Sequence, residues 1–411
     1  MITERTRVCI VGGGPAGVML GLLLARGGID VIVLEKHADF FRDFRGDTVH
    51  PSTLNVIDQL GLRAEFDAIP HAPLHTLDAV IDGVRVHAID FGSLPAPNRF
   101  VTLMPQWDLL DMLAGAARRH PTFRLLMGAD VTGTITEGGR IVGVEAQTSD
   151  GALRVEADLT IGADGRGSTV RNSLGLVAVE YGVPIDVAWF RIPRPVDPLP
   201  DTLIWGSPTA MLVTIPRPGY LQCGMLIPKG SFDSIRAVGI EGFRARIAAA
   251  APRLAGVARE LASFEDVKLL SVQIDRLRRW WRPGALCIGD AAHAMSPIFG
   301  VGINYAVQDA VAAANLLIPV LNHPAAPPAA IDRALGALQR RRALPTALMQ
   351  RIQRIAHGVI GSGGGLHLLH NPPTRRERMV MRVAIPTARP ILARIVGYGF
   401  RPERIRSGAR P

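Results

Sequence analysis

The first residues able to do chemistry form a glycine-rich turn near the start of the chain. Residues 12–17 read Gly-Gly-Gly-Pro-Ala-Gly, a GxGxxG spacing, between an apolar run at 7–11 and an apolar helical pattern at 16–26. Glycines allow the backbone to approach a pyrophosphate closely, and the helix N-terminus attracts its charge. Glu35 ends the next apolar run, 18 residues after Gly17. A carboxylate there suits a ribose hydroxyl, so the pattern predicts a dinucleotide-binding βαβ unit.

Two further apolar runs end in an adjacent aspartate and glycine. Residues 158–163 lead into Asp-Gly at 164–165, and residues 285–288 lead into Gly-Asp at 289–290. A proline, two glycines and an asparagine follow the second pair, before a helical pattern that begins at 307. A strand, a glycine-rich loop and a helix N-terminus again suit an anionic or electron-rich group.

These three motifs, in this order, resemble those of the para-hydroxybenzoate hydroxylase family of group A flavin monooxygenases. The resemblance extends from residue 7 to about residue 317. It implies non-covalently bound FAD, and NAD(P)H as a transient co-substrate, because no second GxGxxG follows a strand. It implies cofactor contacts at Gly12, Gly14, Pro15, Ala16, Gly17, Glu35, Lys36, Arg45, Gln106, Val131, Asp164, Gly165, Gly289, Asp290, Pro297, Gly300, Gly302, Ile303 and Asn304.

The resemblance places the adenosine half of FAD on the first βαβ unit. The GxGxxG turn holds the pyrophosphate, and Glu35 holds the adenosine ribose. Arg45 is a phosphate partner, Gln106 is the polar residue that opens a helix, and the backbone of Val131 meets the adenine.

The other two motifs are implied to hold the flavin half. Asp164, with the glycine after it, supports both FAD and the passing nicotinamide nucleotide, and Asp290 bonds a ribityl hydroxyl. The N–H groups of Gly300 and Gly302 face the pyrimidine edge of the flavin, and Asn304 lies beside the ring.

The implied reaction is hydroxylation of an aromatic or polycyclic substrate, phenolic or polyketide-like, through a flavin C4a-hydroperoxide. Such a site must exclude water. An apolar strand pattern fits this requirement, since Met211, Val213 and Ile215 alternate along one strand and Leu226 is expected to face them. Each of these residues fits an ordinary sheet core equally well.

The sequence does not single out a catalytic base. His50, Tyr181 and Tyr220 are candidates for deprotonating a phenol, with Pro297 a further candidate in the glycine-rich loop. A structural role is the more common one for each residue type. His293 is expected to pack or to form hydrogen bonds rather than to catalyse.

Three other functions remain open for the same fold. One is non-hydroxylating flavin chemistry, as in an isoprenoid reductase or a halogenase, and another is Baeyer–Villiger insertion. Halogenase relatives carry a Trp-x-Trp-x-Ile signature, whereas this chain has only adjacent tryptophans at 280–281. A non-catalytic FAD carrier is the third, and the residues implied around the ring argue against it.

The elements that must position these residues follow from hydrophobic periodicity. Ser52 is the expected N-cap of a helix that ends at Gly61. Helices are expected at 16–26, 52–60, 107–119, 240–250, 307–317 and 332–358. Strands are expected at 7–11, 30–34, 123–127, 131–137, 141–148, 152–157, 158–163, 185–192, 210–215, 220–227, 267–274 and 285–288, with hairpin strands within 75–91 and short antiparallel ones from 123 to 157.

This order of elements predicts an α/β fold with an α+β insertion. A glutathione-reductase-like Rossmann domain for FAD is expected at 1–70 with 100–175 and 276–325. It is interleaved with an antiparallel-sheet substrate domain at 71–99 with 176–275. A C-terminal helical segment with a basic tail occupies 326–411.

Composition excludes several classes of protein. The net charge of +10 comes almost wholly from arginine, and the chain shows no nucleic-acid-binding motif. Three distant cysteines give neither a disulfide framework nor a metal site, so a reducing cytoplasm is expected. The glycines at 12–17 argue against a signal peptide, and no charge-free run is long enough to cross a membrane.

The C-terminal tail from residue 375 mixes arginines with apolar residues. Such a mixture can dock on an anionic membrane surface. Packing of its apolar residues against the FAD domain is favoured, because Pro386 and Pro390 interrupt a long amphipathic helix. Whether the protein is a monomer or a homodimer stays open.

Overall fold

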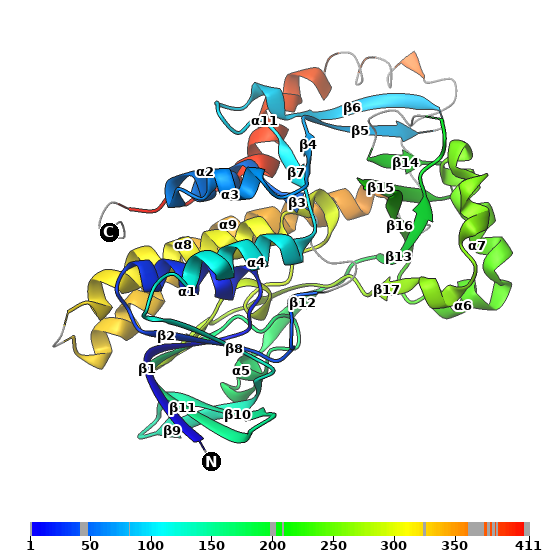
Figure 1. Ribbon diagram of the computed structural model, residues 1–411. Coiled ribbons are helices and arrows are strands. Elements are labelled where there is room, and N and C mark those ends of the chain that lie inside the picture. Colours follow the sequence, from blue (N-terminus) through cyan, green and yellow to red (C-terminus); the bar gives the residue numbers. More distant parts are fainter. Residues whose placement is uncertain are drawn as a thin grey trace.

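The computed structural model describes residues 2–41, 48–81, 83–197, 203–207, 209–323, 326–360, 374–375, 379, 383 and 385–406. It shows two large sheets (Figure 1). One sheet lies under a layer of long helices, and the other stands at the side of the molecule with two helices along its outer side. The α/β class expected from the sequence is therefore confirmed.

The first sheet has a parallel core. Its strands are β1 (Ile2–Val11), β2 (Val31–Glu35), β8 (Phe123–Met127), β9 (Asp130–Glu137), β10 (Arg140–Thr148), β11 (Gly151–Gly162), β19 (Trp281–Arg282) and β20 (Ala285–Cys287). Their order is β19-β20-β11-β1-β2-β8, in which β20, β11, β1, β2 and β8 run parallel. The antiparallel hairpin β9–β10 extends the sheet from β11.

Two expectations for this sheet were wrong. The strand at 123–127 is parallel to β2, not part of an antiparallel set. The runs at 152–157 and 158–163 are one strand, β11, whose burial alternates in its first half and is continuous in its last four residues. The first half pairs with the β10 hairpin, whereas the second lies between β1 and β20. The change of pattern therefore marks a change of surroundings within one strand.

Four long helices cover one face of this sheet (Figure 1). They are α1 (Pro15–Arg26), α4 (Gln106–Ala117), α8 (Gly302–Leu321) and α9 (Pro328–Ile360). Helix α1 is buried from Ala16 to Ala25. It packs closely on the sheet at Gly21, where a Cβ would lie 2.8 Å from the ring of Phe123.

Helix α8 begins five residues before its expected start at 307. The stretch Ile298–Leu321 is long and apolar enough to cross a membrane, but 89% of the apolar window is buried inside the molecule. Its neighbours are α1 and α9. Helix α8 is thus the central core helix of the layer that covers the first sheet.

The second sheet is antiparallel apart from one pair. Its order is β17 (Lys268–Leu270), β13 (Ile185–Pro193), β16 (Tyr220–Pro228), β15 (Met211–Arg217), β14 (Ile204–Gly206), β5 (Thr76–Ile81) and β6 (Val84–Asp90). The exception is β14, which runs parallel to β5. Helices α6 (Phe232–Val238) and α7 (Ile240–Ala250) lie along its outer side (Figure 1).

The strand expected at 267–274 is divided in two. Residues 268–270 form β17 in the second sheet, while β18 (Ile274–Leu277) pairs with β12 (Ala178–Tyr181) in a sheet of two strands. Between them, the backbone N–H of Val272 donates to the buried carboxylate of Asp186 at 2.9 Å. That side-chain contact takes the place of a ladder hydrogen bond, so the chain leaves the sheet there.

Helix α2 (Pro51–Leu60) begins one residue before the expected N-cap Ser52. His50 is the N-cap, and Pro51 occupies the first helical position, where its missing N–H costs nothing and its fixed φ suits a helix. Gly61 ends the helix with φ +75°, as expected.

The remaining elements are short or C-terminal. They are β3 (Thr48–Val49), β4 (Ala72–Leu74), β7 (Val101–Leu103), α3 (Arg63–Asp67), α5 (Thr169–Ser173), α11 (Ile385–Tyr398) and the 3-10 turns Phe91–Ser93, Pro252–Leu254, Val257–Glu260, Phe264–Asp266, Gly289–Ala291 and Ile298–Gly300. In α11, Ala393 and Val396 are buried while Ile391 is exposed. The tail therefore packs on the protein through one side of α11.

Candidate active site

The glycine-rich turn after β1 has a different constraint at each glycine. Gly12 has φ +104°, and a Cβ there would lie 2.4 Å from the carbonyl oxygen of Ala163. A Cβ on Gly17 would lie 1.9 Å from the carbonyl oxygen of Gly12. A Cβ on Gly14, the N-cap of α1, would meet no atom of a more distant described residue within 4 Å. The outer glycines are thus required by the fold, and the middle one leaves space for a ligand.

Glu35 holds this turn from the end of β2. Its buried carboxylate accepts the backbone N–H of Gly13 at 2.8 Å and that of His37 at 3.1 Å. These two bonds fix the Glu35 carboxylate beside the glycine-rich turn. Lys36, the next residue, is exposed.

A cavity of about 250 Å³ lies beyond the end of β2. The rings of Phe41 and Trp107 lie 4.9 Å apart in its wall, and Trp107 follows Gln106, the first residue of α4. Val131 is buried on β9. Arg45, expected to contact a phosphate, lies outside the described residues.

The aspartate of the Asp-Gly pair binds the turn that follows it. The Asp164 carboxylate accepts the hydroxyl of Ser168 at 2.5 Å and the backbone N–H of Val170 at 3.2 Å, at the start of α5. Burial raises the pKa of Asp164, and these hydrogen bonds oppose that rise. Gly165 follows with φ +80°, so the chain turns sharply here.

The Gly-Asp pair touches both other motifs. Gly289 has φ +58°, and a Cβ there would lie 3.2 Å from the Cβ of Ala16 in α1. The partly exposed carboxylate of Asp290 lies 3.3 Å from Nε of Arg166, which follows the Asp-Gly pair. The three motifs, separated by more than a hundred residues each, therefore meet at the N-terminus of α1.

The loop between Pro297 and α8 is held by residues from an early part of the chain. Its Gly300 has φ +64°, and a Cβ there would lie 2.2 Å from Oγ1 of Thr48. The Gly300 carbonyl accepts the Thr48 hydroxyl at 2.8 Å and Nε2 of His50 at 3.1 Å. Phe299, with φ +67°, adds a second left-handed residue. Only glycine fits at 300, and strand β3 fixes the loop.

Asn304 presents an unused donor in the first turn of α8. Its Oδ1 accepts the hydroxyls of Ser52 and Thr53, the latter at 3.1 Å. Its Nδ2 is buried without a hydrogen-bond partner among the residues that the structure describes. A buried donor without an acceptor is costly, so the geometry calls for an acceptor from a ligand. Ile303, beside it, is buried.

Comparison with known proteins agrees with this geometry. A family model described as FAD binding domain matches residues 5–351. The 6-methylpretetramide 4-monooxygenase of Streptomyces rimosus is 34% identical over 98% of this chain and 94% of its own length. Kynurenine 3-monooxygenase of Salinispora arenicola is 29% identical over 76% of this chain and 72% of its own.

Solved structures share the fold. PqsL of Pseudomonas aeruginosa, a probable FAD-dependent monooxygenase, matches with a TM-score of 0.74 at 23% identity, over 88% of this chain and 98% of its own. OxyS anhydrotetracycline hydroxylase of Streptomyces rimosus matches with a TM-score of 0.72 at 22% identity, over 96% of this chain and 76% of its own.

This chain is a group A flavin monooxygenase of the FAD binding domain family. It is an FAD- and NAD(P)H-dependent enzyme, as the motifs implied. The site of the monooxygenase fits the cofactor on two observations of its own: open space at Gly14 before a helix N-terminus, and the buried, unpartnered Nδ2 of Asn304. The first suits a pyrophosphate and the second suits an acceptor on the flavin ring.

The four residues expected to line the substrate pocket of the monooxygenase share one face of the second sheet. Met211 and Leu226 are cross-strand partners, and Val213 and Ile215 follow at alternate positions. Ile298, from the loop before α8, packs against the apolar cluster on this face. That cluster comprises Ala79, Ile81, Ile185, Met211 and Leu226, with Val86, Ile204, Val213 and Ile298 at its margin.

The structure does not bring the candidate bases together. His50 lies beside the loop between Pro297 and α8, which we call the flavin loop. Burial lowers the pKa of His50 to about 4, and its Nε2 donates its proton to the Gly300 carbonyl. The Tyr181 hydroxyl, on β12, accepts a hydrogen bond from Arg276 at 2.9 Å. Tyr220 begins β16, six residues and therefore about 20 Å along the strand from Leu226. Pro297 opens the flavin loop.

Several contacts at the site escaped the sequence analysis. Ser52 contributes a hydroxyl to Asn304 instead of an N-cap. Thr48 fixes Gly300, and Ile298 joins the flavin loop to the second sheet. Each pairs residues from distant parts of the chain. Hydroxyl residues around the start of α2 were the only local signal.

Proposed function

We propose that this monooxygenase hydroxylates a polycyclic phenolic substrate of the polyketide type. The observation that carries the proposal is the apolar face of the second sheet, which Ile298 joins to the cofactor loop. A wide, flat wall of aliphatic side chains suits a fused-ring system better than a small charged metabolite. The 34% identity to 6-methylpretetramide 4-monooxygenase, over nearly the full length of both chains, supports the same substrate class.

We also propose how this chain holds FAD. The pyrophosphate lies at Gly14 and the N-terminus of α1, the ribose at Glu35, and a ribityl hydroxyl at Asp290. The amide of Asn304 donates to the flavin ring, and the fixed loop at Gly300 and Gly302 faces the pyrimidine edge. Bound FAD supplies the redox chemistry that links NAD(P)H oxidation to O₂ reduction.

The protein's own task is then to orient the substrate and to exclude water. Met211, Val213 and Leu226 present no polar atom to a bound ring system. His50 remains neutral near pH 7, because burial lowers its pKa to about 4, and its Nε2 holds the Gly300 carbonyl in place. We therefore propose that His50 positions the loop and does not abstract a proton.

The same proposal covers domain limits and location. The FAD domain comprises 1–70, 100–175 and 276–325, and the substrate domain comprises 71–99 and 176–275. The three cysteines are buried, with pKa values of the thiols raised by burial, in keeping with a reducing cytoplasm.

A substrate screen tests the proposal. Purified enzyme with NADH or NADPH is offered a tetracyclic phenol, a single-ring phenol and kynurenine in labelled O₂. We expect only the tetracyclic phenol to stimulate nicotinamide oxidation and to gain one labelled oxygen on a ring carbon. Stimulation by kynurenine or the single-ring phenol alone would refute the polycyclic substrate. A chlorinated, reduced or ring-expanded product would instead favour the non-hydroxylating or Baeyer–Villiger alternatives.

A further inference from the structure

Asp309 anchors the Gly-Asp motif from inside the core. It lies in the middle of α8 and is completely buried. Its Oδ2 accepts the backbone N–H of Gly289 at 3.1 Å and Nε2 of His293 at 2.6 Å, while Oδ1 accepts Nε of Arg342 at 2.9 Å. Burial acts to raise the pKa of Asp309, but His293 and Arg342 outweigh it and hold the pKa below its ordinary value. An ionised carboxylate therefore fixes Gly289, the second residue after β20.

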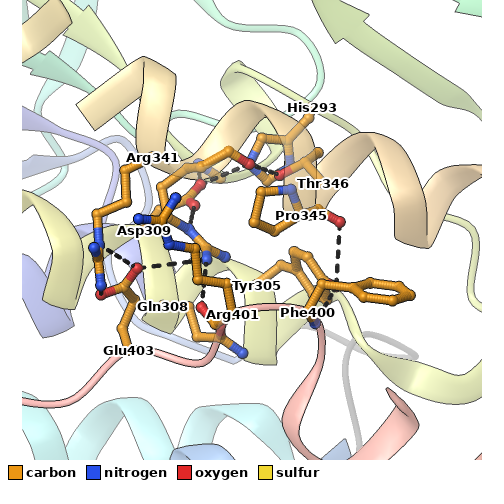
Figure 2. Close-up of polar contacts among 12 residues, drawn as sticks. His293, Tyr305, Gln308, Asp309, Arg341, Pro345, Thr346, Phe400, Arg401 and Glu403 are labelled. Atoms are coloured by element: carbon orange, nitrogen blue, oxygen red, sulfur yellow. Dashed lines mark hydrogen bonds and ion pairs between the residues drawn. The ribbon is translucent and has the colours of Figure 1, made fainter. Parts of the chain in front are cut away.

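Arg342 extends this contact to Glu403, in the C-terminal segment 399–406. Its guanidinium is completely buried on α9, with Nη1 3.8 Å from Oε1 of Glu403. Glu403 in turn binds Nε and Nη2 of Arg341 at 2.7 Å each, a bidentate pair (Figure 2). Two carboxylates thus face two guanidiniums across three segments of the chain.

The C-terminal segment, residues 399–406, reaches this cluster along one side of α8. Gly399 turns the chain with φ +74°, where a Cβ would lie 3.1 Å from the hydroxyl of Tyr305. That hydroxyl also accepts the backbone N–H of Phe400 at 3.4 Å. Further along, Nδ2 of Asn315 donates to the carbonyl of Arg404 at 2.8 Å. Glu403 is therefore held in the core from both sides.

These contacts are coupled because their charges are desolvated. Arg342 shares its positive charge between Asp309 and Glu403, and a buried guanidinium that loses one carboxylate must reorganise around the other. Gly289 has little room to follow, since it is packed against Ala16 and Ala306. A change at Glu403 that moves Arg342 and Asp309 therefore weakens the Asp309–Gly289 hydrogen bond, which holds the turn that carries Asp290.

We propose that Asp309 is a positioning residue for FAD, and that the C-terminal segment completes the cofactor site indirectly. Glu403 holds Arg342 against Asp309, and Asp309 holds the Gly289–Asp290 turn at the N-terminus of α1. The proposal rests on the proposed contact between Asp290 and the ribityl chain. It makes residues 399–406 a requirement for tight FAD binding, although they lie outside the matched region 5–351.

The test is FAD affinity, measured by titrating apoprotein with FAD and following flavin fluorescence. We expect Asp309→Asn to raise the FAD dissociation constant roughly 10- to 100-fold, the range for a lost charge-assisted hydrogen bond. Glu403→Gln, at the outer end of the relay, should raise it about 3- to 10-fold. In the Asp309→Asn background, Glu403→Gln should add less than about a factor of two, because coupled residues are not additive.

Asp78 supplies a matched control. It is a completely buried carboxylate that also binds an arginine and a histidine, with Arg85 at 2.7 Å and His87 at 2.9 Å, but it lies in the β5–β6 hairpin of the second sheet. Asp78→Asn should lower the melting temperature of the apoprotein and leave FAD affinity unchanged. A role for Asp309 in stability alone would give it this same result.

The outcomes separate the relay from the contact on which it rests. An unchanged dissociation constant in Asp290→Ala would show that Asp290 does not touch FAD and would remove the basis of the relay. A weakened Asp290→Ala with an unchanged Asp309→Asn would overturn the relay alone. If Asp309→Asn fails to fold, Glu403→Gln decides: unchanged FAD affinity in that variant refutes the proposal, and weakened affinity with little change in the apoprotein melting temperature supports it.

Discussion

Asp309 and Asp78 have partners of the same types in different surroundings. Both are fully buried, and both bind one arginine and one histidine. The partners of Asp309 are themselves buried, whereas the side chains of Arg85 and His87 are 45% and 49% exposed. Asp309 also accepts a backbone N–H from a cofactor motif, while Asp78 links two strands of one hairpin.

The difference shows that the connections of a buried charge decide its role. Water can solvate Arg85 and His87 when their carboxylate is lost, so the damage stays within the hairpin. Water cannot reach the buried guanidinium of Arg342 in the same way, and this group on α9 faces carboxylates on α8 and in the C-terminal segment. Around Asp309, buried charge therefore joins distant segments of the half that holds the glycine-rich motifs (the cofactor half). Around Asp78, in the second sheet (the proposed substrate half), the carboxylate joins only neighbouring strands.

The largest expected effect is the difference in the free energy of unfolding between variants of the two aspartates. Asp309→Ala should lower the free energy of unfolding by about 3–5 kcal/mol, because Arg342 is left buried beside a single distant carboxylate. Asp78→Ala should cost only about 1–2 kcal/mol, since both of its partners can be hydrated. Urea unfolding of the two apoproteins measures the difference. Equal losses would show that burial of the partners does not matter.

A second substitution sharpens the contrast at the cofactor. Asn304→Asp keeps the size of the side chain but replaces the unpartnered donor Nδ2 with an acceptor, so the flavin ring would meet like dipoles. We expect the FAD dissociation constant to rise roughly 10- to 100-fold. The control is Asn98→Asp, another fully buried asparagine, which donates to Asn55 and Asp58 and belongs to none of the motifs. That variant should lose stability but bind FAD normally.

The motifs could be predicted from the sequence because their constraints are local. Gly12, Gly17 and Gly300 are required by backbone geometry within a short loop, and a spacing of glycines records that requirement. The contacts of Thr48, His50 and Ser52 could not be predicted, because each joins residues about 250 positions apart. Such pairs depend on how α2 and α8 pack, which no local pattern contains.

One missed residue did leave a signal. Asp309 is the only charged residue between 298 and 321, in a helix that is otherwise apolar or neutral. A lone carboxylate in such a helix must be paired, since an unpaired buried charge is far too costly. Its partners on α9 and in the C-terminal segment, however, were visible only in the structure. Tyr181 and Tyr220 show the converse, because residue type alone suggested chemistry there, and their roles stay predictions.

The substrate half should respond in the opposite way to the cofactor half. Met211→Trp fills the apolar face beside Leu226 and Ile298, so it should lower kcat/KM for a polycyclic substrate about tenfold while FAD affinity stays constant. Leu212→Met, on the other face of the same strand, is a conservative control within the α6–α7 core. Weaker FAD binding in Met211→Trp would show that the second sheet also affects the cofactor and would contradict this prediction.

The smallest expected effect is a pH dependence that belongs to the cofactor half. Burial lowers the pKa of His50 to about 4, while an unfolded chain protonates its histidines below about 6.5. Between these values the unfolded state binds more protons, so stability is fully present above about pH 6.5 and falls toward pH 4. Burial also lowers the pKa of His357 to about 4, and its Nε2 lies 2.8 Å from the Ser296 hydroxyl. His50→Gln should therefore make the loss of stability with acid shallower, and His50→Gln with His357→Gln shallower still. Urea midpoints at pH 7, 6 and 5 measure the slope, and an unchanged slope in the double variant would show that neither imidazole is kept neutral by the fold.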